Sequence, residues 1–106
     1  MNPNAIHLDE LDPKHERRRY RREIKDRDGH KCVYCGGDAN TLDHLVSKSA
    51  GGPTTSDNLV TACASCNLRK GDKNVWEWYS QQPFYTSERW NRIKEITGYD
   101  HINQTD

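Results

Sequence analysis

The fold of this chain is decided by residues 32–70, CVYCGGDANTLDHLVSKSAGGPTTSDNLVTACASCNLRK. Two CxxC pairs lie near the two ends of this stretch, Cys32 with Cys35 and Cys63 with Cys66. Four thiolates in two pairs are the usual ligands of a tetrahedral zinc ion, with bonds of about 2.3 Å. Because sulfur would fill all four positions, we expect a closed structural zinc site that does not bind substrate.

Other uses of the four cysteines are reduced thiols without a metal, a redox pair, or an iron centre with four thiolates. Composition favours a metal that stabilises the fold. Of the 106 residues only 32% are apolar and 30% are charged. A chain this short and polar buries a small core, and a bound metal is a common source of additional stability in such domains.

The formal net charge is zero, so overall charge identifies no partner. No apolar run approaches the roughly 18 residues of a membrane span, and the first residues lack the basic and apolar regions of a signal peptide. We therefore expect a soluble, cytoplasmic protein without a membrane partner. Cysteines in this setting bind metals more often than they form disulfides.

Helix and strand signals predict one α+β domain over residues 12–98, between an N-terminal arm (1–11) and a polar tail (99–106). A helix begins at Asp12-Pro13 and ends at Gly29. Strands at 40–47 and 59–62 flank a loop at 48–57, and a helix follows the last cysteine and ends at Gly71. Further helices are predicted at 74–82, before Pro83, and at 86–97. The three tryptophans are expected to cover the core rather than stack on bases; they are Trp76, Trp78 and Trp90.

Four polar residues between and just after the cysteine pairs could carry chemistry: Asp43, His44, Asn58 and Asn67. An Asp-His dipeptide alone is usually a surface feature. Here the strand that carries it is anchored by cysteines at both ends. Carboxylate and amide oxygens are ligands for Mg²⁺ or Mn²⁺. A histidine, with an ordinary pKa of about 6.5, can accept a proton from water near neutral pH.

The segment DHLVSKSAGGPTTSDNLVTACASCNLRKGD resembles the HNH nuclease family, and the resemblance covers residues 30–73. It implies a small ββα-metal core at about 40–71, with structural zinc and flanking helices. By that resemblance His44 matches the general base and Asp43 the first ligand of a catalytic ion. Asn58 matches the asparagine that supports the loop, and Asn67 stands where the family name expects histidine. The chain is thus an HNN version.

The resemblance further implies a metal-dependent DNA endonuclease of a bacterium or phage, with catalytic Mg²⁺ or Mn²⁺ and products ending in 3′-hydroxyl and 5′-phosphate. One ββα-metal unit offers one cleavage centre. A monomer would therefore nick one strand, and a double-strand break would need a homodimer or two nearby nicks. In a phage, a terminase-like protein would be a further partner.

Basic residues are expected to bind the phosphates of the nucleic acid. Several lie on the helix at 14–22, others in the loop and near Gly71; the candidates are Arg17, Arg18, Arg21, Arg22, Lys48, Arg69, Lys70 and Lys73. The alternatives are a solvated helix face for the arginines and, near Gly71, the preference of helix C-termini for cations. For the whole protein the rival interpretations are a non-catalytic zinc module that binds nucleic acid and a packaging accessory protein.

Overall fold

The computed structural model describes residues 14–99. The expected N-terminal arm and the helix start at Asp12-Pro13 lie outside the described residues. Four α-helices, a two-stranded sheet and one 3₁₀ turn follow in the order α1 (Lys14–Arg27), β1 (Thr41–His44), η2 (Lys48–Ala50), β2 (Leu59–Ala62), α2 (Ala64–Lys70), α3 (Val75–Tyr79) and α4 (Ser87–Thr97). None of the helices among the described residues is long and apolar enough to cross a lipid bilayer.

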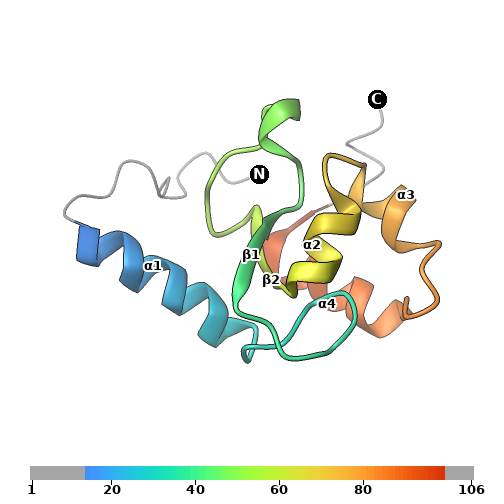
Figure 1. Ribbon diagram of the computed structural model, residues 1–106, viewed down its shortest axis with the longest axis horizontal. Coiled ribbons are helices and arrows are strands. Elements are labelled where there is room, and N and C mark those ends of the chain that lie inside the picture. Colours follow the sequence, from blue (N-terminus) through green and yellow to red (C-terminus); the bar gives the residue numbers. More distant parts are fainter. Residues whose placement is uncertain (1–13, 100–106) are drawn as a thin grey trace.

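A ββα unit forms the centre of the molecule, as the sequence predicts (Figure 1). Strands β1 and β2 are antiparallel, and Asp43 pairs with Val60 while His44 pairs with Leu59. Helix α2 contacts β1 and helix α1 contacts β2. All four residues of β2 are buried, which agrees with the apolar character of the LVTA segment. The predicted α+β class is therefore confirmed.

Strand β1 is shorter than the predicted 40–47, because the Asn58 side chain takes the place of a strand partner at Val46. The Leu45 N–H donates to the Asn58 carbonyl at 2.9 Å, and the Val46 N–H donates to the Asn58 side-chain oxygen at 3.0 Å. The chain then turns into η2. The pairing of β1 with β2 therefore ends at His44 and Leu59, and the loop between the two strands begins at Leu45.

Aromatic side chains fill the core, as predicted for the tryptophans. Trp78 and Trp90 are buried, and Trp76 packs on the core from a half-buried position. Tyr34 is fully buried and meets the Trp78 ring edge-on, with the ring centroids 5.1 Å apart. Tyr99 was expected at the start of the polar tail, but it is buried against Trp90, with ring centroids 5.7 Å apart.

The predicted helix at 74–82 is cut to Val75–Tyr79. Gln82 N–H bonds to the Tyr79 carbonyl, three residues back, so the chain tightens into a turn before Pro83. Pro83 has no N–H to donate to the Tyr79 carbonyl four residues back, which accounts for the early end. Helix α4 agrees with the prediction: Thr86 caps it and Gly98 ends it in a left-handed conformation.

Helix α1 is anchored at its C-terminal end and extends away from the body at its N-terminal end (Figure 1). The Arg27 guanidinium donates to the carbonyls of Ser56 and Leu59, each at 2.8 Å. The Tyr20 hydroxyl accepts from the Ser56 N–H at 2.7 Å, and Ile24 is buried. These contacts fix α1 to the segment that leads into β2.

Candidate active site and metal centre

The four cysteines come together as the sequence predicts, and none forms a disulfide. Their sulfur atoms all lie within 4.8 Å of one another, and the Cys35 and Cys63 sulfurs are 3.8 Å apart. A tetrahedral zinc site with bonds of about 2.3 Å has sulfur–sulfur edges of about 3.8 Å. The four residues therefore form a metal site whose dimensions fit zinc.

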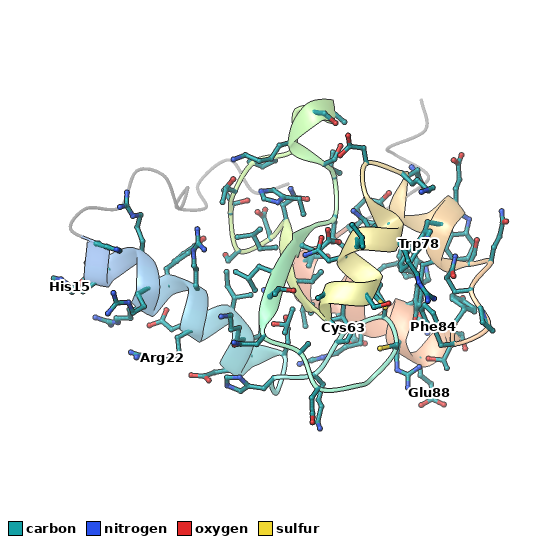
Figure 2. All side chains as sticks on the ribbon, viewed as in Figure 1. His15, Arg22, Cys63, Trp78, Phe84 and Glu88 are labelled. Carbon is teal, nitrogen blue, oxygen red and sulfur yellow. The ribbon has the colours of Figure 1, made fainter. Side chains whose placement is uncertain are left out.

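Two tight turns present the sulfurs. The Cys35 N–H points to the Cys32 sulfur at 3.5 Å, and the Cys66 N–H points to the Cys63 sulfur at 3.4 Å. The second pair spans the start of α2, where Cys63 is the N-cap (Figure 2). Burial raises the pKa of the Cys32 and Cys66 thiols, so a cation is needed to hold them as thiolates.

Three of the predicted catalytic residues meet in one pocket of about 270 Å³ beside β1 and α2. Asp43 and His44 come from β1, and Asn67 comes from the first turns of α2. The full set of lining residues is Leu42, Asp43, His44, Ser47, Lys48, Asn67, Gly71 and Asp72. The ββα unit thus brings a carboxylate, an imidazole and an amide to the same place.

Asp43 is buried, and donors contact both of its carboxylate oxygens. The Tyr34 hydroxyl donates to Oδ2 at 2.6 Å, and the Lys70 ammonium lies 3.2 Å from Oδ2 and donates to Oδ1 at 3.4 Å. Burial raises the pKa of Asp43, and this effect outweighs the opposing influence of Lys70 and Tyr34. The carboxylate is therefore held in a fixed orientation at the pocket.

His44 is half-buried, and its ring nitrogen Nε2 lies 3.0 Å from the Thr54 hydroxyl oxygen. Thr54 is itself buried in the loop between η2 and β2. The sequence pattern does not single out Thr54. The loop is rich in hydroxyl residues, but its composition does not show which hydroxyl lies next to the imidazole.

Asn58 lies outside the pocket lining and acts on the loop. It is fully buried, its side-chain oxygen accepts from the Val46 N–H, and its side-chain nitrogen donates to the carbonyls of Val46 and Pro53 at 3.0 and 2.8 Å. These bonds tie the segment after His44 to the segment before Thr54. The supporting role that the resemblance implies for Asn58 stays a prediction.

Asn67 is oriented by the strand it faces. Its side-chain nitrogen donates to the Leu42 carbonyl at 2.9 Å. Because an amide has one donor end and one acceptor end, this bond leaves the oxygen as the end suited to a cation.

The expected phosphate contacts divide into two groups. Lys48 lines the pocket, and Arg69 and Lys73 are exposed near the end of α2. Lys70 is fully buried, and its ammonium donates to the His44 carbonyl at 2.7 Å as well as contacting Asp43. The prediction that Lys70 contacts phosphate from the surface is therefore wrong, since its charge is already used inside the protein.

Helix α1 gathers cations on one face. Lys14, Arg17, Arg18 and Arg21 line a cavity of about 390 Å³, and their spacing of three and four residues is that of one helix face. Arg22, also expected to contact nucleic acid, does not line this cavity and points away from the body (Figure 2).

Comparison with known families agrees with this geometry. Residues 32–73 match the family model described as HNH endonuclease. This segment is an HNH domain. The match begins at the first cysteine of the metal site and extends past α2, so it contains the metal site and the pocket. No curated protein matches the chain. The matched segment is thus similar to HNH endonucleases and contains the four-cysteine site.

Proposed function

We propose that this protein is a metal-dependent DNA endonuclease that hydrolyses phosphodiester bonds and nicks one strand at each active site. The observation that supports this most directly is the meeting of Asp43, His44 and Asn67 in one pocket of the HNH domain. These are the three groups that hydrolysis at a phosphate requires: a base and two hard oxygen ligands.

His44 is the proposed general base. Its Nε2 faces the Thr54 hydroxyl oxygen, which can accept a hydrogen bond from an Nε2–H group. Holding the proton on Nε2 leaves Nδ1 as the basic nitrogen, which would take a proton from the attacking water. Asn58 keeps the loop that carries Thr54 in register with His44.

Asp43 and Asn67 would hold the catalytic Mg²⁺ or Mn²⁺ through their side-chain oxygens, while zinc occupies the four-cysteine site. The bound divalent ion would supply positive charge to the scissile phosphate and the leaving oxygen. The chain's own part is to orient the two oxygens: Tyr34 and Lys70 fix Asp43, and the Leu42 carbonyl fixes Asn67.

Basic side chains would hold the DNA around this pocket. Lys48 lies at its edge, Arg69 lies on the exposed side of α2, and Lys73 is exposed just beyond the end of α2. The α1 face adds a separate group of cations. Contacts of this kind position a duplex by its phosphates and carry no sequence information directly. With one site per chain, a monomer would nick, and a double-strand break would need a homodimer or two nearby nicks. The expected products end in 3′-hydroxyl and 5′-phosphate, and the expected setting is the cytoplasm of a bacterium or phage-infected cell.

The test is incubation of supercoiled plasmid with purified protein and Mg²⁺ or Mn²⁺. His44→Ala should reduce nicking by about 10² to 10⁴-fold, the usual contribution of a general base. His30→Asn is the matched control, because His30 is exposed, pairs with Asp26 at 2.7 Å, and has a left-handed backbone that asparagine tolerates. Equal nicking by wild type and His44→Ala would contradict the assignment.

A second candidate is a non-catalytic zinc module that binds nucleic acid. One observation favours it: Asp43 is already paired with Lys70. Tight DNA binding without cleavage under any divalent ion would support this alternative. Co-purification with a terminase-like protein would instead place the nuclease in phage packaging.

A further inference from the structure

Lys70 is an unusual neighbour for a residue that would bind a divalent cation. The side chain is fully buried, and its ammonium lies 2.7 Å from the His44 carbonyl and 3.2 Å from Asp43 Oδ2. A lysine charge is rarely buried unless it is paired, and this one is paired with the carboxylate proposed as the metal ligand. A positive charge therefore already contacts, from the protein interior, the carboxylate that is expected to bind a divalent cation.

The formal charges around the pocket cancel. Asp43 and Asp72 line it as acids, Lys48 lines it as a base, and Lys70 contacts Asp43 from the protein interior. Asn67 contributes an oxygen without charge. A Mg²⁺ ion is usually held by one or two carboxylates together with substrate phosphates. Here the charge of Lys70 offsets that of Asp43, and the charge of Lys48 offsets that of Asp72. The missing negative charge would have to come from the DNA.

We propose that Lys70 keeps the catalytic ion weakly bound until DNA is present, so that the divalent ion and the nucleic acid bind cooperatively. This inference rests on the proposed function, because it concerns the same pocket. The physical cause is the repulsion between an ammonium and a dication that share one carboxylate in a partly desolvated site. A bound phosphate offsets that repulsion, and each ligand then raises the affinity of the other by the same factor.

A comparison with Tyr34 distinguishes the effect of the Lys70 charge from the effect of orienting Asp43. Its hydroxyl donates to the same Oδ2 atom at 2.6 Å, so it orients the carboxylate as Lys70 does, but it adds no charge. If Lys70 acts only by orienting Asp43, removing either donor should weaken metal binding. If Lys70 acts by its charge, removing the ammonium should strengthen metal binding, and removing the Tyr34 hydroxyl should not.

The first experiment measures Mn²⁺ binding to the zinc-loaded protein without DNA, by electron paramagnetic resonance of the free ion. Lys70→Met, which keeps most of the length of the side chain and removes its charge, should bind Mn²⁺ at least tenfold more tightly than wild type. Tyr34→Phe should bind it with equal or lower affinity. Zinc content and a thermal melt check that each variant is folded. A folded Lys70→Met protein that binds Mn²⁺ no more tightly than wild type would overturn the proposal.

A second experiment keeps Lys70 in place, in case Lys70→Met does not fold. Mn²⁺ affinity is measured on His44→Ala protein, which should leave DNA intact, with and without a short duplex at fixed ionic strength. The same titration of protein that also carries Asp43→Asn subtracts the ions bound by the DNA alone. Duplex should tighten Mn²⁺ binding at the Asp43 site at least tenfold. Equal affinities with and without duplex would overturn the proposal.

A result that contradicts this inference would not contradict the proposed function. Both experiments follow ion binding without turnover, whereas the nuclease assignment is tested by plasmid nicking. Cleavage that depends on His44, combined with Mn²⁺ binding that is indifferent to DNA and to Lys70, would remove this inference and leave the nuclease in place.

Discussion

At the scale of single residues, Gly52 stands out because it lies against the loop's own backbone. A Cβ atom at Gly52 would lie 1.8 Å from the Val46 carbonyl oxygen and 2.9 Å from the Asn58 side-chain nitrogen. Any side chain at this position must therefore push apart the two segments that Asn58 joins. Its neighbour Gly51 differs: its backbone is left-handed, with φ of +86°, but nothing lies within 4 Å of an added Cβ.

The two adjacent glycines make a matched pair of variants. Gly52→Ala should cost about 1–3 kcal/mol of stability, the usual cost of overpacking, and should reduce nicking at least tenfold because Thr54 moves relative to His44. Gly51→Ala should cost about 1–2 kcal/mol from its backbone conformation and keep most of the activity. Thermal melts and plasmid nicking measure both effects. Activity of Gly52→Ala equal to that of Gly51→Ala would show that the loop position does not matter.

Sequence alone predicted the residues that meet in the pocket, because Asp43, His44 and Asn67 belong to a recognisable pattern. It did not predict the residues that hold them. Arg69 and Lys70 are adjacent basic residues at a helix end, yet Arg69 is exposed and Lys70 is fully buried. Only the rotation of α2 against β1 separates the two. A local sequence pattern does not predict how α2 is rotated about its axis, so it does not predict the pairing of Lys70 with Asp43.

At the scale of elements, helix α1 divides into an anchored half and a cationic half. Arg27 and Tyr20 fix it to Ser56, while Arg17, Arg18 and Lys14 lie on one face nearer its start. The net charge of zero hides this face, since acids elsewhere balance it. Phosphate contacts by such a face give affinity that falls steeply with salt.

Arg18→Ala combined with Arg21→Ala should weaken DNA binding and lower the slope of log affinity against log salt by about 1.8, or about 0.9 for each phosphate that is no longer neutralised. Arg19→Ala is the control, because Arg19 pairs with Glu23 on the same helix at 3.2 Å. Fluorescence anisotropy of a labelled duplex at several salt concentrations, without divalent ions, measures the slope. An unchanged slope in the double variant would assign α1 a structural role only.

Helix positions were easier to predict than strand and helix lengths. Gly29, Gly71 and Gly98 mark the ends of three helical segments, and Thr86 caps the last one, so local chemistry was sufficient there. The end of β1 depends on the Asn58 side chain, which reaches it from twelve or more residues away. A bond between residues this far apart in the chain cannot be predicted from a short stretch of sequence.

At the scale of the whole molecule, Tyr34 connects the four-cysteine site to the pocket. Tyr34 lies between Cys32 and Cys35 in the chain, packs edge-on against Trp78, and donates to Asp43. Its carbonyl accepts from the Tyr79 hydroxyl at 2.7 Å. Loss of the metal would therefore disturb both the aromatic core and the orientation of Asp43.

Zinc removal should unfold the domain. Structural zinc in small peptides contributes roughly 10–16 kcal/mol, which is as large as the whole stability of an ordinary domain, about 5–15 kcal/mol. Cys32→Ser should have the same effect, because it removes one of the four sulfurs. Circular dichroism melts with and without a zinc chelator, with zinc content measured in parallel, test this. A melt that does not change when zinc is removed would exclude a structural role for the ion.

The central claim is that the zinc-bound hairpin and helix point an imidazole and two hard oxygen ligands at one phosphate. The most direct measurement is anomalous diffraction at the zinc and manganese edges from crystals of His44→Ala protein with Mn²⁺ and a short duplex. The account predicts zinc among the four cysteine sulfurs and manganese in contact with Asp43, Asn67 and a DNA phosphate. Manganese elsewhere, or Asp43 and Asn67 turned away from the phosphate, would contradict it.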